Sequence, residues 1–148
     1  MPNRPQWSAL IITAISLSVA HDATAAPQCP NLSGNYMIQG EDGQVHIAID
    51  QRGCDRISIV RKSGYLGTIT SVTHVLKLDG KEQKDSPWFG PKEPNRTSAK
   101  FVGSELQVRA RLTSGSTLTL IYSLTPTGDL LEDPSNGRGV PLLAKRQK

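Results

Sequence analysis

The chain has 148 residues, with 17 Lys and Arg residues, 13 Asp and Glu residues and a formal net charge of +4. Hydrophobic residues make up 36% of the chain and are spread along its length, which excludes wholesale disorder and supplies one core, so we expect a single domain. The glycines show no period of three, which excludes a collagen-like chain, and no pattern indicates a coiled coil or a multi-span membrane protein.

The first 25 residues predict a signal peptide. Arg4 forms a short positive region, and the stretch 9–20 after it is uncharged and mostly apolar. This stretch is shorter than the about 20 apolar residues that a spanning helix needs, and it lacks the amphipathic stripe of a buried helix. Ala23-Thr24-Ala25 has the small-x-small pattern that precedes a cleavage site. We therefore expect cleavage after Ala25, a secreted or periplasmic protein formed by residues 26–148, and no membrane span.

Both cysteines of the chain, Cys29 and Cys54, lie in the predicted exported part. An even pair in an oxidising compartment is most simply a disulfide. It would close a loop of about 25 residues and stabilise the fold by about 3 kcal/mol. Metal ligation and a redox pair fit less well, because the spacing is far from Cys-x-x-Cys and no His or Cys cluster stands beside either residue.

Apolar and polar residues alternate with a period of two along most of residues 26–148, which is typical of β-strands with one buried face. Turn signals interrupt the alternation at Arg52-Gly53, Lys62-Ser63-Gly64, Asp79-Gly80 and Ser114-Gly115. Of these, Asp79-Gly80 is a strong signal for a two-residue hairpin, because both positions tolerate positive φ. The pattern predicts an all-β, antiparallel up-and-down meander of about eight strands, closed on itself or packed as two sheets. The expected core consists of Val45, Ile47, Ile57, Ile59, Ile69, Leu106, Val108, Leu118, Leu120 and Tyr122.

Two segments lack this alternation and are expected to be loops. Residues 84–95 contain three prolines and a glycine, which exclude a central strand, and residues 133–139 precede the C-terminal end. We expect the basic tail 145–148 to be frayed. The first loop carries Trp88 and Phe89, and two interpretations stay open. Aromatic residues on a loop can bind a partner, or their rings can fold back and plug the open end of the barrel.

Three short stretches resemble small exported bacterial lipocalin-like barrels. Residues 29–36 read Cys-Pro-Asn-Leu-Ser-Gly-Asn-Tyr, residues 76–82 place Asp-Gly-Lys-Glu after a strand, and residues 118–131 join two strands through a glycine turn. The resemblance implies an up-and-down barrel or a half-open one, and we expect a lipocalin-like barrel of about eight strands. It carries over no functional residue, because each stretch is a fold motif. The chain differs from true lipocalins in having Tyr36 where their Gly-x-Trp opening has tryptophan.

The candidate catalytic and metal-binding residues give little support to an enzyme. The histidines of the predicted domain, His46 and His74, have no His-x-x-x-His spacing and no evident third ligand. No Gly-x-Ser-x-Gly motif occurs, and the carboxylates are scattered, although a facing pair of the glycosidase kind stays open. We expect no enzymatic activity, no metal and no cofactor. On a strand, His74 would share a face with Val72 and Leu76.

Arg109 and Arg111 are two residues apart, so on a strand they share one face, with Lys100 expected across a hairpin. This face could bind an anionic partner, but we favour a solvated strand face. Aromatic residues do not interleave with it, as binding of single-stranded nucleic acid would require. We therefore expect no nucleic-acid partner.

Two functions remain open for such a domain. The first is binding of a small apolar or amphipathic ligand inside the barrel, on a wall that includes Tyr122, with the Trp88-Phe89 loop as a lid. The second is an interaction or inhibitor module for an envelope protein, acting through that loop and the face with Arg109 and Arg111. We favour the first function, and the sequence does not indicate the oligomeric state.

Overall fold

The computed structural model describes residues 29–40, 43–65, 67–85, 95–112, 114–135 and 139–148. The predicted signal peptide 1–25 and the loop residues Trp88 and Phe89 lie outside the described residues. The described part of the chain contains no helix long and apolar enough to cross a membrane. It forms ten strands: β1 (Gly34–Gly40), β2 (Gly43–Arg52), β3 (Arg56–Tyr65), β4 (Thr68–Lys77), β5 (Gln83–Asp85), β6 (Asn95–Val102), β7 (Glu105–Arg111), β8 (Thr117–Leu124), β9 (Leu130–Pro134) and β10 (Leu142–Arg146).

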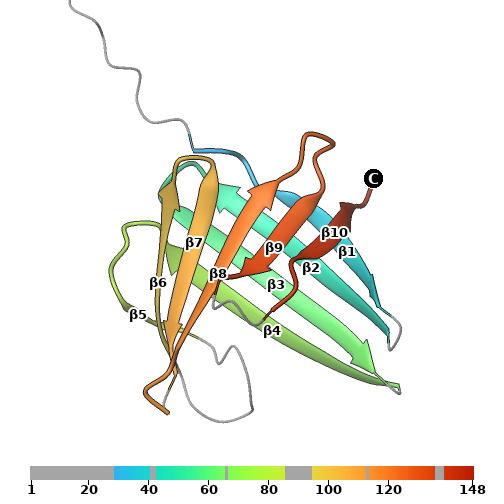
Figure 1. The fold of residues 1–148 in the computed structure, drawn as a ribbon, viewed down its shortest axis with the longest axis horizontal. Coiled ribbons are helices and arrows are strands. Elements are labelled where there is room, and N and C mark those ends of the chain that lie inside the picture. Colours follow the sequence, from blue (N-terminus) through green and yellow to red (C-terminus); the bar gives the residue numbers. More distant parts are fainter. Residues whose placement is uncertain (1–28, 41–42, 66, 86–94, 113, 136–138) are drawn as a thin grey trace, which may run out of the picture.

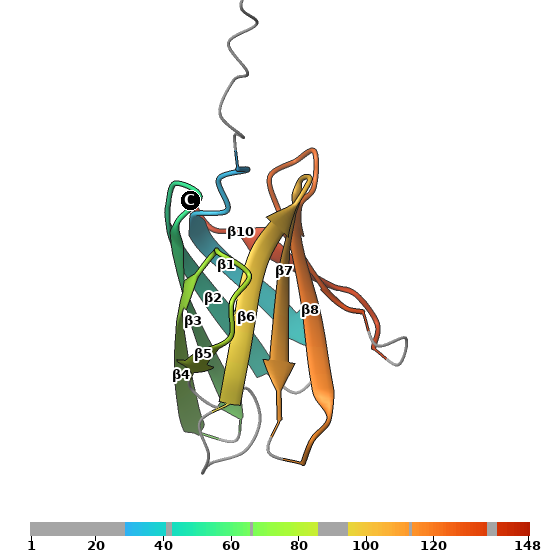
Figure 2. The same cartoon turned by 90° about the vertical axis from the view of Figure 1, so that its left-hand side faces the viewer.

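The ten strands form one antiparallel sheet in the order β4-β3-β2-β1-β10-β9-β8-β7-β6-β5. The sheet curls until its two ends face each other, and β4 then lies beside β5 and β6 (Figures 1 and 2). The result is a nearly closed barrel, which confirms the predicted all-β meander. Because β4 and β5 are the two ends of the hydrogen-bonded order, contacts outside the strand ladders have to join the seam between them.

The count of about eight strands was low because two short strands lie in segments that were predicted to be irregular. Gln83–Asp85 forms β5 at the edge of the sheet, where prolines in the residues that follow do not interrupt a central ladder. The C-terminal tail forms β10, and its residues Lys145 and Arg146 pair with Met37 and Tyr36 of β1. The prediction of a frayed tail was wrong, because β10 supplies the backbone partners for the facing edges of β1 and β9.

The period-two pattern predicted most of the core correctly, since eight of the ten expected residues are buried. Val45 is half-buried and packs against the core. Ile69 was predicted wrongly, because its side chain is 77% exposed. The register explains the error: Ile69 pairs with Gly64 on the outer face of β3 and β4, whereas the inner face of β4 carries His74 and Leu76, both buried.

Two predicted turns are also corrected by the structure. Lys62-Ser63-Gly64 lies inside β3, which continues to Tyr65, so the chain turns later, before Thr68. Asp79-Gly80 turns the chain but joins no two-residue hairpin, because β4 and β5 are not paired. Instead the Asp79 carboxylate accepts a hydrogen bond from the backbone N–H of Lys81. The N–H of Gly80, at φ 74°, donates to the carbonyl of Ala99 on β6, so this turn connects the chain across the seam.

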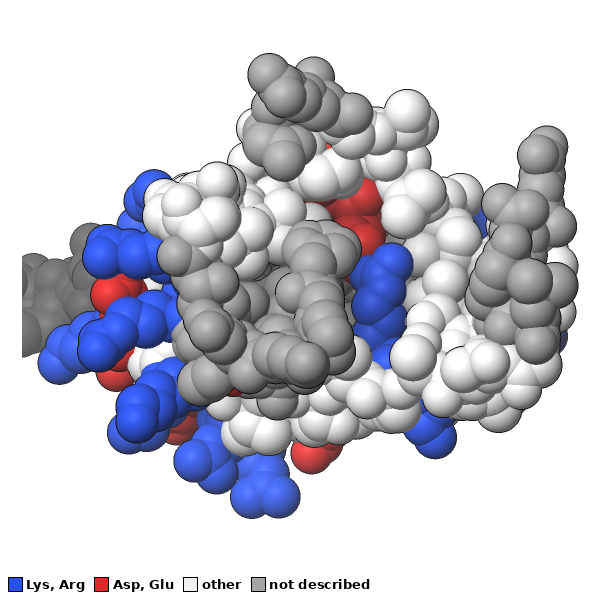
Figure 3. Space-filling model, turned by 90° about the horizontal axis from the view of Figure 1, so that it is seen from below, with Lys and Arg blue, Asp and Glu red and all other residues white. Residues whose placement is uncertain are grey.

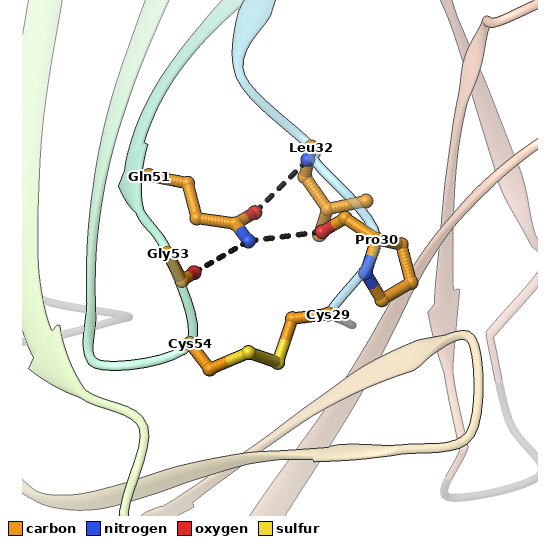
Figure 4. Close-up of a disulfide and its surroundings, with 6 residues drawn as sticks. All are labelled: Cys29, Pro30, Leu32, Gln51, Gly53 and Cys54. Atoms are coloured by element: carbon orange, nitrogen blue, oxygen red, sulfur yellow. Dashed lines mark hydrogen bonds between the residues drawn. A yellow bond between two sulfur atoms is a disulfide. The ribbon is translucent and has the colours of Figure 1, made fainter. Parts of the chain in front are cut away.

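The predicted disulfide between Cys29 and Cys54 is present, with a Cα–Cα distance of 5.5 Å. It attaches the segment before β1 to the turn between β2 and β3 (Figure 4). The side chain of Gln51 reinforces this attachment, because it accepts from the N–H of Leu32 at 2.9 Å and donates to the carbonyls of Pro30 and Gly53. Leu32 is fully buried, so this end of the barrel is closed by covalent and apolar contacts.

Tyr36, which stands at the tryptophan position of the Gly-x-Trp opening, belongs to the same closure. Its ring is 1% exposed, and its hydroxyl donates to the carbonyl of Leu32 at 2.8 Å. The guanidinium of Arg146 lies over the ring, 5.7 Å from its centre. Tyr36 thus fills the end of the barrel and ties the entering segment to β1 and β10.

Candidate ligand site in the barrel lumen

On β3 and β4, the inner wall of the barrel changes from apolar to polar along the strands. On β3, buried Ile57 and Ile59 near the disulfide are followed on the same face by Arg61 and Ser63. On the paired strand β4, Leu76 is followed by His74. The end of the lumen away from the disulfide therefore carries side chains that can form hydrogen bonds with a guest.

An ion pair crosses this polar part of the lumen. One guanidinium nitrogen of Arg61, Nη1, donates to both carboxylate oxygens of Glu132, at 2.7 Å and 2.6 Å. The two residues are 71 positions apart in the sequence and lie on β3 and β9, which three strands separate in the sheet. The side chain of Glu132 is 6% exposed and that of Arg61 is 31% exposed, so solvent reaches the pair from the Arg61 side.

Tyr122 lies beside this pair, directly opposite Glu132 in the register of β8 and β9. Burial raises the pKa of Tyr122 well above its ordinary range, and the charge of Glu132 and a hydrogen bond to it act in the same direction. Burial by itself lowers the pKa of Arg61, but the hydrogen bond and the charge of Glu132 outweigh it, so this pKa is raised. Tyr122 is therefore a protonated phenol and Arg61 a full cation at neutral pH.

A second buried pair lies at the seam of the barrel. His74 Nδ1 of β4 is 2.8 Å from Asp85 Oδ2 of β5, and each side chain is 2% exposed. The prediction that His74 shares a face with Val72 and Leu76 is confirmed, and Val72 is half-buried on that face. Within the described strands, no group of three or more His, Cys, Asp and Glu residues could hold a metal ion.

Figure 3 views the molecule from the polar end, opposite to the disulfide. Near the centre of this face, an acidic and a basic patch adjoin each other in a hollow between the surrounding side chains. Most other Lys and Arg side chains in this view gather along its left side, which is the side of β5, β6 and β7 in Figure 1. The polar end of the lumen is thus separate from the basic outer surface.

The structure does not bring the sequence-predicted site residues together. Tyr122 faces the lumen and is 1% exposed, whereas Arg109, Arg111 and Lys100 are exposed on the outer face of β6 and β7. The prediction that these three cations share a face is confirmed. Arg111 also forms an ion pair of 2.9 Å with Glu82, which reduces the charge of that face.

The other predicted histidine, His46, is exposed on β2. It contributes to a hollow of about 330 Å³ lined by Gln44, His46, Lys62, Ser63, Gly64 and Ile69. This lining includes neither Arg61 nor Glu132, so the hollow is distinct from the ion pair.

Sequence reasoning missed Arg61 and Glu132, the two residues that dominate the lumen. A signal for Arg61 was present, because it continues the period of two from Ile57 and Ile59 and therefore points inward. Glu132 likewise follows Leu130 by two positions on β9. A carboxylate and a guanidinium at inward positions of separate strands can form an ion pair across the lumen. The strand pattern alone, however, does not show that β3 and β9 face each other.

The sequence matches no family model, and no curated protein resembles it at a significant level. Solved structures do share its fold. A point mutant of the fluorescent protein UnaG aligns with a TM-score of 0.61 and 18% identity over 78% of this chain and 96% of that chain. A point mutant of the REP1-NXSQ fatty acid transporter aligns with a TM-score of 0.57 and 15% identity over 78% of this chain and 98% of that chain.

At these identities the likeness concerns the fold alone. The nearly closed, ten-stranded barrel of this chain shares its fold with these two solved structures. The resemblance to lipocalin-like barrels is therefore confirmed at the level of an up-and-down β-barrel. Beyond the shared fold, two features describe the barrel of this chain. They are the Arg61–Glu132 pair across the lumen and the disulfide at the closed end.

Proposed function

We propose that this chain is an exported, non-enzymatic binding protein that takes a small amphipathic ligand into the polar end of its barrel. The observation that carries the proposal is the Arg61–Glu132 pair, which lies across the lumen with Arg61 31% exposed. Partly solvated polar groups inside an otherwise apolar wall are the arrangement that orients a ligand in a pocket. The apolar part of a ligand would then contact the lumen wall around Val72 and Leu118.

Two further features support parts of this proposal. One similar structure is a fatty acid transporter by name, which makes uptake of an amphipathic molecule a reasonable use of this barrel. The signal-peptide pattern at residues 1–25 and the Cys29–Cys54 disulfide fit a protein that folds in an oxidising compartment. The alternative role in binding an envelope protein depends on Trp88 and Phe89 and stays a prediction.

The test is binding of an uncharged fluorescent probe, N-phenyl-1-naphthylamine, to the purified protein with its disulfide formed. Its emission rises when it enters an apolar site. We expect saturable binding that Val72→Trp weakens by about tenfold or more, because Val72 faces Arg61 in the register and a larger ring fills the lumen.

Thr73→Trp is the matched control, because Thr73 is the next residue on β4 and is exposed on the outer face. It should leave probe binding unchanged. An absence of saturable binding by the wild-type protein would contradict the proposed function. Equal binding by both tryptophan variants would place the probe outside the lumen and would contradict it as well.

A further inference from the structure

We infer that the ligand of this lumen carries an uncharged hydrogen-bonding head, such as an amide or a hydroxyl group, and that Glu132 excludes carboxylates. This inference rests on the proposed function and names the chemical class of its ligand. The question is whether the positive charge of Arg61 is neutralised by Glu132 or is free to bind an anionic ligand. The name of the similar fatty acid transporter would suggest a carboxylate ligand, so the two possibilities make opposite predictions.

The charge of Arg61 is already compensated. Both oxygens of Glu132 accept from Nη1 at 2.7 Å and 2.6 Å, and the Glu132 side chain is 6% exposed. A ligand carboxylate placed against Arg61 would lie next to this second, buried carboxylate. Like charges in a site of low polarity repel each other strongly, so the site would have to expel Glu132 or reject the anion.

No other cation of the described lumen is available to balance such a ligand. Among the described residues, the charged side chains that face this part of the interior are Arg61, Glu132, His74 and Asp85. His74 is itself paired with Asp85 at 2.8 Å. Even with His74 protonated, these four groups carry no net positive charge, and the cations Lys100, Arg109 and Arg111 are on the outer face.

Hydrogen-bonding groups nevertheless remain for an uncharged head. In the hydrogen bonds of Arg61 to described residues, the donor is Nη1. Nε and Nη2 can therefore donate to a carbonyl or hydroxyl oxygen of a ligand. The oxygens of Glu132 have further lone pairs that can accept from an amide N–H or a hydroxyl. A group that both donates and accepts therefore fits the pair without changing its charge.

The experiment compares decanamide and 1-decanol with decanoate, three ligands with the same chain length. Each ligand is added to the purified protein with N-phenyl-1-naphthylamine bound, and displacement of the probe is measured near neutral pH, where decanoate is ionised. We expect decanamide and 1-decanol to displace the probe at about tenfold lower concentration than decanoate. In Glu132→Gln, decanoate should improve by about tenfold, because the positive charge of Arg61 is then uncompensated.

Asp133→Asn is the matched control, because Asp133 follows Glu132 on β9 and pairs with Ile121 on the other face. It removes the same charge and should not change the ranking. The double variant Arg61→Gln with Glu132→Gln lacks both charges and should not gain decanoate binding.

A wild-type preference for decanoate would overturn the inference while leaving the proposed function standing, since the probe would still bind. An unchanged affinity of Glu132→Gln for decanoate would also overturn it. If Glu132→Gln does not fold, the order of the three ligands in the wild-type protein and the decanoate affinity of the double variant still test the inference. A wild-type protein that binds no probe would instead remove the proposed function itself.

Discussion

His74 on β4 and Asp85 on β5 join the two strands that the hydrogen-bonded order of the sheet leaves at its opposite ends. Their side chains meet at 2.8 Å, and each is 2% exposed. A barrel whose end strands are not joined by a β-ladder needs contacts of this kind at its seam. The Gly80 N–H, which donates to the Ala99 carbonyl at 2.9 Å, adds a second connection across it.

We predict that His74→Phe destabilises the protein by about 2 kcal/mol, because it removes a buried hydrogen bond that joins β4 to β5. Urea unfolding followed by circular dichroism measures the change. His46→Phe is the control, because His46 is exposed on β2, and its effect should stay within about 0.5 kcal/mol. Equal stabilities of the two variants would show that the seam does not depend on the His74–Asp85 pair.

The second prediction concerns pH and Asp129, in the turn between β8 and β9. The pKa of Asp129 is lowered first by its hydrogen bond from Lys145, at 2.8 Å, and then by the Arg146 N–H, at 3.0 Å. A lowered pKa means that the folded state favours the carboxylate. Its contribution to stability is therefore fully present above the unfolded-state pKa, near 3.8, and is lost as the pH falls through the folded-state value.

We thus expect Asp129→Asn to be less stable than the wild-type protein at neutral pH and the difference to shrink in acid. Thermal unfolding measured from neutral pH to below pH about 3 tests this. Asp50→Asn, which changes an exposed carboxylate on β2, should show no such convergence. A stability difference for Asp129→Asn that is independent of pH would mean that its charge is not responsible.

The third prediction follows from two like charges on the outer face. Arg96 of β6 and Arg111 of β7 are directly opposite in the register, and such a pair is unfavourable by about 0.2–1 kcal/mol. The ion pair between Arg111 and Glu82 offsets this only in part, because both side chains are largely exposed. We expect Arg96→Thr to stabilise the protein by about 0.5 kcal/mol in low salt, with a smaller gain in high salt.

Arg109→Thr is the matched control for this substitution. Arg109 lies on the same face of β7, but it is opposite Ser98, not opposite another cation. Its replacement should give no gain in urea unfolding at either salt concentration. If both variants are stabilised equally, the overall positive charge is the cause, and the cross-strand contact is not.

The fold was largely predictable because its information is local. The alternation of apolar and polar residues indicates which side chains of a strand face inward, and it identified buried positions from Ile47 to Tyr122. The candidate site was not predictable in the same way. Arg61 and Glu132 each face inward by local pattern, but their contact spans 71 residues and depends on the curvature and closure of the whole sheet. Tyr122 was named as a candidate, but its relation to Glu132 required the register of β8 and β9.

The error at Ile69 has a physical cause that can be tested. β4 has apolar residues on both faces, since Ile69 and Val75 are exposed while Val72 and Leu76 face inward. The alternation in β4 therefore does not define its inner face.

Because Ile69 is 77% exposed, Ile69→Ala should lower the free energy of unfolding by at most about 0.5 kcal/mol. Ile59→Ala removes the same atoms from a side chain that is 1% exposed, and it should cost about 3 kcal/mol. Urea unfolding of both variants measures the ratio, and similar losses would mean that β4 has the opposite facing, with Ile69 in the lumen and His74 outside.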